Sequence, residues 1–342
     1  TLPVVDSSKT AARASLRVCY TPLHGVGGEV FTELLTRAGF ESVIPVAAQM
    51  QPDGSFPTVS FPNPEEPGAL DLAIEAAQRE NADLIIANDP DADRLAVCLP
   101  RKESHTWEML TGNELGAILA WSAGTKAAKE GRTGVIGYSL VSSPIAGVIA
   151  AHFGLDARET PTGFKWISRI PGLVFGYEEA LGYLVNPETV RDKDGMSAGL
   201  LLADIAASWH EQGLTLWDAL DEVRAEVGAF SSGQVSLRFE TPETAQALMA
   251  HIRDNLDAVF SDLPVRSITD LLHGSESMPP SDIIRFDLDG GDRLIVRPSG
   301  TEPKLKVYLD CLRPSQEQAE QAVADLEQVV SSRFDEMVTN LG

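Results

Sequence analysis

The sequence predicts two consecutive α/β domains with mainly parallel mixed sheets, followed by a small α+β domain with an antiparallel sheet. Three observations support this fold class. Apolar strand-like segments alternate with helical segments up to about residue 227, as in parallel βα units. After residue 233, strand-like segments follow one another directly. The 342 residues are 43% hydrophobic, which is enough to bury a core in two or three domains.

The first α/β domain is expected over residues 16–115, and residues 1–15 are expected to be a linker remnant. Its expected strands are apolar runs, of which 83–87 is apolar without interruption, as in a strand buried on both faces. Its expected helices have apolar residues at helical spacing. The expected elements are a strand at 16–20, a Gly-rich loop, a helix at 29–37, a strand at 42–46, a helix at 69–79 and the strand at 83–87.

The second α/β domain is expected over residues 116–229 and repeats the alternation of strands and helices. The expected elements are helices at 112–129, 142–153, 196–212 and 215–227, and strands at 134–140 and 172–177.

The third domain is expected over residues 230–342, with Phe230–Gly233 as the linker candidate. Because strand-like segments here are adjacent along the chain, an antiparallel sheet is predicted. The expected elements are strands at 234–240, 282–288, 292–298 and 304–310, a helix beginning at the cap-like Thr241-Pro242-Glu243, and a final helix at about 315–334.

The composition excludes several classes of partner. Lys and Arg number 27 against 50 Asp and Glu, a formal charge of −23, which argues against sequence-independent binding to nucleic acid or to an anionic membrane. The sequence has no apolar run near the roughly 20 residues of a bilayer span and no signal-peptide pattern, so a cytoplasmic protein is expected. The three cysteines, separated and set in apolar stretches, are expected to be core thiols. No oligomeric state is predicted.

The segment Asn88–Arg94, directly after the expected strand 83–87, is the strongest candidate for chemistry. Its carboxylates at Asp89, Asp91 and Asp93 could converge on one hard cation such as Mg²⁺. An EF-hand is excluded, since counting from Asp89 its sixth position is Arg94 and its twelfth is Pro100.

Two further loops are candidates for binding a phosphorylated sugar. Residues 297–304 combine a guanidinium, two hydroxyls and a glycine, donors that suit a phosphate group, although an ordinary hairpin turn has a similar composition. Glu178 and Glu179, between two glycines, could accept hydrogen bonds from a sugar diol, although an exposed acidic turn is the commoner reading. Lys165 and Lys193 are lesser candidates for phosphate contacts, and His24 is expected to be structural.

Five motifs in this order, DPDADR, TPTGFKWI, GYEEALGY, RDKDG and RPSGTEPK, resemble the α-D-phosphohexomutase superfamily. The resemblance runs from about Leu16 to the C-terminus and looks closest to the bacterial phosphoglucomutase/phosphomannomutase branch that includes phosphopentomutase-like members. It implies a phosphosugar mutase that moves a phosphoryl group between the C1 and C6 hydroxyls of a hexose phosphate, through an enzyme phosphoserine and a sugar 1,6-bisphosphate.

The resemblance also implies roles for individual residues. Asp89, Asp91 and Asp93 would hold Mg²⁺, and Arg94 would face the active-site phosphoryl group, with Lys193 as a nearby cation. The residues implied to meet the sugar or the non-reacting phosphate are Thr162, Gly163, Lys165, Glu178, Glu179, Arg297, Ser299, Gly300 and Thr301.

This chain departs from the family pattern in two places. Ala180 stands where family members often carry Ser, which bears on the sugar preference. Family enzymes carry their phosphoserine in a Thr-Ala-Ser-His-Asn-Pro-like loop of a first domain, and the sequence contains no such segment. The chain is therefore expected to correspond to domains two to four and to be inactive alone. A non-catalytic sugar-phosphate binding protein and a phosphopentomutase are the alternatives.

Overall fold

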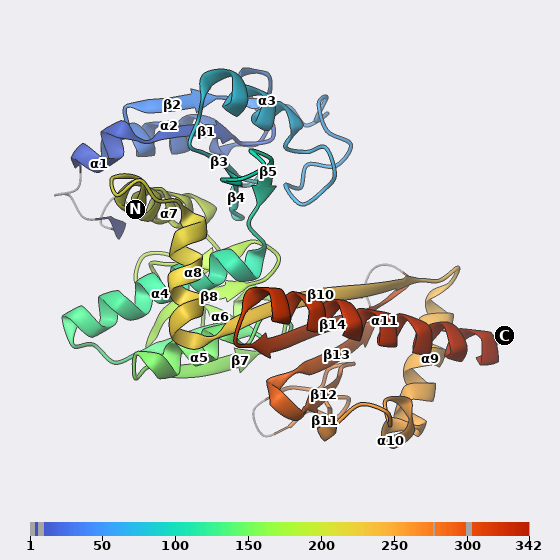
Figure 1. Cartoon of the computed structure of the whole chain (residues 1–342). Coiled ribbons are helices and arrows are strands. Elements are labelled where there is room, and N and C mark those ends of the chain that lie inside the picture. Colours follow the sequence, from blue (N-terminus) through green and yellow to red (C-terminus); the bar gives the residue numbers. More distant parts are fainter. Residues whose placement is uncertain (1–3, 6–9, 276–277, 299–302, 342) are drawn as a thin grey trace. The chain divides into compact units, whose positions relative to one another are not determined.

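The computed structural model describes residues 4–5, 10–275, 278–298 and 303–341. Its contacts divide the chain into two units, Thr1–Val223 and Arg224–Gly342. The first unit contains two separate sheets and the second contains one (Figure 1). Within the described ranges, no helix is both long and apolar enough to cross a bilayer.

The first sheet has five strands, three of which are parallel. Its elements are α1 (Thr10–Ser15), β1 (Arg17–Thr21), α2 (Gly27–Ala38), β2 (Ser42–Pro45), η2 (Ala47–Gln49), α3 (Asp71–Glu80), β3 (Leu84–Ala87), β4 (Ala96–Pro100) and β5 (Trp107–Met109). The strand order is β2-β1-β3-β4-β5, with β1 parallel to β2 and β3, and with β4 and β5 added antiparallel. Every residue of β3 is buried, in keeping with its apolar sequence.

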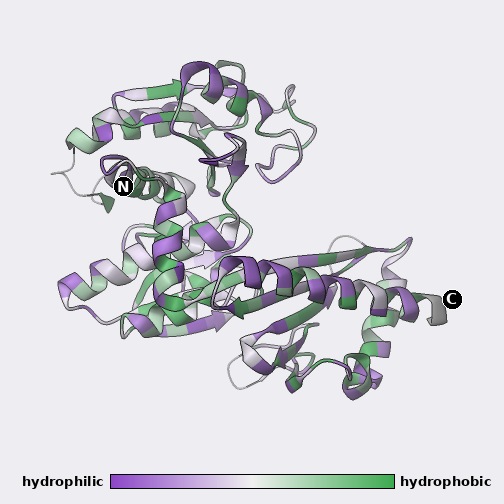
Figure 2. Ribbon diagram, in the orientation of Figure 1, coloured by the Kyte–Doolittle hydropathy of each residue, from purple (hydrophilic) through white to green (hydrophobic). Residues whose placement is uncertain are grey.

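The second sheet has four strands. The elements of this part are α4 (Gly112–Glu130), β6 (Val135–Ser139), α5 (Ile145–His152), β7 (Asp156–Thr160), α6 (Phe164–Ile167), β8 (Leu173–Glu178), β9 (Gly182–Leu184), α7 (Gly195–His210) and α8 (Leu216–Val227). The order is β7-β6-β8-β9, parallel except for β9. A capping box begins α4, because the Thr111 side chain accepts from the Glu114 N–H and the Glu114 side chain accepts from the Thr111 N–H. Helix α7 is hydrophobic over much of its length (Figure 2).

The sheet of the second unit is antiparallel throughout. Its elements are β10 (Ala229–Arg238), α9 (Pro242–Asp254), α10 (Leu256–Val259), β11 (Val265–Asp270), β12 (Ile284–Leu288), η3 (Asp289–Gly291), β13 (Arg293–Pro298), β14 (Lys304–Arg313) and α11 (Gln316–Leu341). The strand order is β10-β14-β13-β12-β11. Helix α11 packs along β10 and β14 and carries both hydrophobic and hydrophilic residues (Figures 1 and 2). Its apolar face, including Val330 and Phe334, completes a core with the inward residues of the strands.

The predicted fold class is confirmed: two mixed sheets that contain parallel strands precede a small antiparallel one. The three cysteines are buried and free, as expected of core thiols.

Some predicted boundaries need correction. Residues 10–15 form α1 and hold a fully buried arginine, Arg13, so they belong to the packed unit and are not a linker remnant. Phe230–Gly233 lies within β10, paired with residues 309–312 of β14, and is therefore not a linker. The expected boundary after residue 115 falls inside α4, because the capping box begins that helix at Gly112. The limits of the three expected domains, 16–115, 116–229 and 230–342, remain predictions.

Five strands were not predicted: β4, β5, β7, β9 and β11. Two of them, β5 and β9, have only three residues, too few to show a hydrophobic alternation. The edge strands β7 and β11 are mainly exposed or half-buried, so their alternation is weak. In β7, for example, the first three residues are exposed.

Candidate functional site

The loop that follows β3 is held in shape by a buried asparagine. Asn88 is fully buried, and its side-chain N–H donates to the main-chain oxygen of Arg94 at 2.6 Å, which closes the loop on itself. The Tyr20 hydroxyl donates to the Asn88 side-chain oxygen at 3.0 Å. Gly195, at the start of α7, packs against the same loop: a Cβ there would lie 2.2 Å from the Arg94 carbonyl oxygen. The loop is therefore tied to β1 and to α7.

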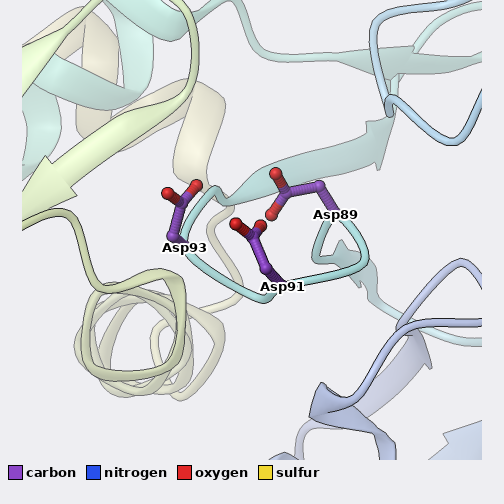
Figure 3. Close-up of side chains that lie close together, drawn as sticks. All are labelled: Asp89, Asp91 and Asp93. Carbon is purple, nitrogen blue, oxygen red and sulfur yellow. The ribbon is translucent and has the colours of Figure 1, made fainter. Parts of the chain in front are cut away.

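This loop gathers Asp89, Asp91 and Asp93 (Figure 3). Each offers a carboxylate oxygen, and these atoms all lie within 4.8 Å of one another. Asp91 is exposed, and the other two are half-buried. Three hard oxygen donors at this spacing fit a small divalent cation such as Mg²⁺.

The electrostatics of Asp89 agree with a cation site. Burial, together with the smaller effect of the neighbouring charges of Asp93 and Asp91, raises the pKa of this carboxyl from 3.8 to about 6. A hydrogen bond from the Arg94 N–H, 2.9 Å long, acts in the opposite direction. A bound cation would relieve the same repulsion that raises the pKa.

Two cations border the acidic triad. The Arg94 Nε lies 3.5 Å from the Asp89 Oδ2, and the Lys193 Nζ lies 2.7 Å from the Asp93 Oδ2. Lys193 precedes the N-cap of α7, where the Asp194 side chain accepts from the N–H groups of the first turn. The cap fixes where the helix begins, and so the main-chain position of Lys193.

Glu178, at the end of β8, lies close enough to Lys193 and Arg94 for their positive charges to act on its carboxylate. Its Oε1 accepts from the Gly163 N–H at 2.6 Å. Burial raises the pKa of the Glu178 carboxyl, and the charge of Glu179 adds to the rise, whereas the Gly163 N–H, Lys193 and Arg94 lower it. The structure thus brings the acidic triad, two cations and Glu178 together within the first unit.

Glu179 is bound to two serines that sequence reasoning did not single out. Its Oε2 accepts from the Ser142 hydroxyl at 3.0 Å and from the Ser139 hydroxyl at 3.3 Å. The Glu179 N–H donates to the same Ser142 oxygen at 3.0 Å. The available signal was their position, since Ser139 ends the parallel strand β6 and Ser142 follows it. The carboxyl ends of β6 and its parallel neighbour β8 lie at the same edge of the sheet.

The side chains of the segment Thr162–Lys165 do not all lie at the same site. Gly163 has φ +111°, a conformation that L side chains rarely adopt, and this turns its N–H toward Glu178. Thr162 is half-buried beside it. Lys165 is exposed and lines a separate surface pocket.

The expected phosphate loop lies in the second unit. Arg297, half-buried near the end of β13, pairs across the sheet with Lys306 of β14. Ser299, Gly300 and Thr301 lie outside the described residues.

His24 has the structural role expected for it. It is almost fully buried, and its Nε2 lies 2.8 Å from the Thr58 hydroxyl oxygen. This contact holds the Gly-rich loop against the segment before α3.

Replacing Asp89 with asparagine should stabilise the metal-free protein at neutral pH. The folded pKa, about 6, lies above the ordinary 3.8, so ionisation costs stability as pH rises from about 4 to about 6. Without a charge to desolvate, Asp89→Asn should be about 3 kcal/mol more stable than the natural chain at pH 7. Urea unfolding in EDTA at pH 4 and pH 7 measures this. The difference should vanish at pH 4, and an equal gain from the exposed Asp156→Asn would contradict the explanation.

Comparison with protein families matches most of the chain to three domains of one family. The family model described as "Phosphoglucomutase/phosphomannomutase, alpha/beta/alpha domain II" matches residues 3–102. The model for alpha/beta/alpha domain III of the same family matches residues 111–226. The C-terminal domain of the same family matches residues 235–329.

Individual relatives agree with this assignment. A Haemophilus influenzae protein described as "Probable phosphomannomutase" is 45% identical over 96% of this chain and 68% of its own length. A human phosphopentomutase is 34% identical over 93% of this chain, and a human glucose 1,6-bisphosphate synthase is 33% identical over 96%. The chain spans 57% of each human protein.

Two solved structures share the fold at low identity. The Paramecium phosphoglucomutase parafusin superposes with a TM-score of 0.78 at 20% identity, covering 97% of this chain and 60% of that one. The Aspergillus fumigatus N-acetylphosphoglucosamine mutase, solved with GlcNAc-6P and magnesium, superposes with a TM-score of 0.56 at 15% identity, covering 95% and 68%.

Proposed function

Because this chain belongs to the phosphoglucomutase/phosphomannomutase family, we propose that it forms the metal-binding and sugar-binding part of a phosphosugar mutase. The reaction proposed is transfer of a phosphoryl group between the C1 and C6 hydroxyls of a hexose phosphate, through an enzyme phosphoserine and a sugar 1,6-bisphosphate. The observation that carries the proposal is the meeting of the acidic triad, Arg94, Lys193 and Glu178 in the first unit.

Asp89, Asp91 and Asp93 are the proposed ligands of Mg²⁺. When bound, this ion neutralises charge on the phosphoryl group being transferred. The guanidinium of Arg94 and the ammonium of Lys193 border the triad and would attract the same phosphoryl oxygens. Their positive charge is needed locally, since the chain as a whole carries −23.

Glu178 is the proposed acceptor for sugar hydroxyls. Its Oε1 already accepts from Gly163, which fixes the carboxylate and leaves acceptor capacity on the other oxygen. Glu179 is bound to two serines, so we assign it the supporting role of holding the end of β8. Thr162 and Gly163 border the same hydroxyl site.

The loop from Arg297 through Ser299, Gly300 and Thr301 is the proposed grip for the non-reacting phosphate. Its support is chemical: a guanidinium, two hydroxyls and a glycine main chain are the donors that a phosphate binds.

The 342 residues alone are proposed to bind sugar phosphate without completing the reaction. Turnover needs the serine that carries the phosphoryl group, and the family's serine loop has no counterpart in this sequence. The alternative functions are a phosphopentomutase, favoured by the human relative of that name, and a non-catalytic sugar-phosphate binding protein.

Intact mass of the natural gene product, before and after phosphatase treatment, tests the mechanism. A mass above that of the 342-residue chain, with one removable phosphoryl group and turnover of glucose 1-phosphate, is the expected result. Faster turnover of ribose 1-phosphate would favour the phosphopentomutase. Binding of sugar phosphate by an unphosphorylated product that gives no turnover would favour the binding protein.

Replacing Glu178 with glutamine tests the hydroxyl site in the 342-residue chain. The amide oxygen can still accept from Gly163, but the loss of a charged acceptor should weaken binding of glucose 6-phosphate about tenfold. Calorimetry with saturating Mg²⁺ measures this, with Glu188→Gln, whose side chain is 84% exposed, as the matched control. Equal affinities for the natural chain and Glu178→Gln would remove Glu178 from the site.

A further inference from the structure

A second cluster of cations lies in the first unit, outside the triad site. A surface pocket of about 540 Å³ is lined by Lys165, Ser168, Arg169, Arg191 and Asp192. Three of these five residues carry positive charge and one carries negative charge. The pocket is therefore locally basic in a chain whose Asp and Glu number 50 against 27 Lys and Arg.

None of these three cations makes an ion pair with a carboxylate in the part of the chain that the structure describes. Lys165 lies against the ring of its neighbour Trp166, with Nζ 5.5 Å from the ring centroid. The Asp192 carboxylate accepts from the Lys193 N–H at 2.8 Å. A pocket that concentrates three such cations beside one carboxylate suits a negatively charged occupant.

The pocket is built from two segments that are linked to each other. Lys165 and Arg169 are four residues apart, on α6 and the turn that continues it, so their side chains emerge on one side. The Arg191 Nη1 donates to the Ser168 carbonyl oxygen at 3.2 Å, which places this guanidinium beside the end of α6. A guanidinium has five N–H donors, so most of those on Arg191 remain for a ligand.

We propose that this pocket binds the phosphate group of a small phosphorylated molecule. Two guanidinium groups and an ammonium group offer charge-assisted hydrogen bonds to phosphate oxygens. The same segments continue into the triad site, since Gly163 lies two residues before Lys165 and Lys193 lies two residues after Arg191. The bound anion would lie next to the two segments that hold Glu178 and Asp93. This site is additional to the proposed function and does not depend on turnover.

Protection from chemical modification tests the pocket residue by residue. Phenylglyoxal modifies exposed arginines, and peptide mass spectrometry reports the rate at each one. In the 342-residue chain without Mg²⁺, inorganic phosphate at several times its dissociation constant should slow modification of Arg169 and Arg191 about fivefold. Arg158, exposed on β7, is the matched control and should react at an unchanged rate.

The same protection experiment with glucose 1,6-bisphosphate shows which kind of molecule supplies the phosphate group. Protection by both compounds assigns the pocket to any free phosphate group, and protection by the bisphosphate alone assigns it to a sugar phosphate. Arg169→Ala should raise the phosphate concentration needed to protect Arg191 about tenfold, as loss of one charged donor predicts. Equal protection of Arg158, or protection confined to Arg297, would overturn the proposal. Because no turnover is measured, either result leaves the proposed mutase function to its own test.

Discussion

Replacing Arg13 with alanine is expected to destabilise the first unit by about 3–5 kcal/mol. The Arg13 side chain is 1% exposed and pairs with Asp204, whose side chain is 10% exposed, with Nη2 2.8 Å from Oδ1. Its Nη1 also donates to the Ala38 carbonyl oxygen at 3.0 Å. The variant would leave a buried carboxylate and a buried carbonyl without these partners, which costs more than the loss of an exposed ion pair.

Urea unfolding, followed by the fluorescence of tryptophans in the first unit, measures this effect. The control is Arg37→Ala, which removes a 64% exposed arginine from a pair with Glu33 and should cost less than about 1 kcal/mol. The double replacement of Arg13 by methionine and Asp204 by leucine should recover most of the stability, because no unpaired charge remains. If Arg13→Ala were as stable as Arg37→Ala, the pair would not hold α1 against α7.

Replacing Asp91 with asparagine is expected to weaken Mg²⁺ binding by at least about 100-fold. Asp91 is the exposed member of the triad, so its loss should leave the fold intact while removing one of three negative ligands. The effect should be large because Mg²⁺ requires near-ideal geometry and few protein ligands, and a neutral amide oxygen is a poor substitute for a carboxylate.

Calorimetric titration of the 342-residue chain with Mg²⁺ measures this affinity. Asp156→Asn removes an exposed carboxylate from β7 and should bind Mg²⁺ as the natural chain does. Circular dichroism of both variants shows whether the fold is kept. Unchanged Mg²⁺ affinity in Asp91→Asn would mean that the triad is not the metal site, and no heat in the natural chain would mean that the chain does not bind this metal.

Most of the fold could be predicted from local patterns. The buried strand β3 is a short apolar run, and the segments around it have helical periods, so the parallel βα units were recognisable. The edge strand β7 was missed because its side chains are mainly exposed and carry no hydrophobic alternation. Residues 230–233 were mistaken for a linker because Ser and Gly are common in loops, whereas pairing with β14 makes them a strand.

The candidate site shows the same division. The acidic triad could be predicted because its three carboxylates come from one short loop, at spacings visible in the sequence. The bonds from Ser139 and Ser142 to Glu179 join residues about forty positions apart, and the pairing of Lys193 with Asp93 spans one hundred. No local pattern indicates such partners, since they depend on which strand ends meet.

The sequence by itself determined that two α/β domains precede an α+β domain. It also determined which loop carries Asp89, Asp91 and Asp93, and that the chain resembles a family of phosphosugar mutases. These depend on residues close together along the chain, whose spacing sets both secondary structure and local chemistry. Only the tertiary structure decided that Arg13 is part of a buried ion pair, that Glu178 and Glu179 have different environments, and that Lys165 lies with Arg169 and Arg191. Burial and long-range contact set these properties, because each arises only when distant segments pack and exclude water.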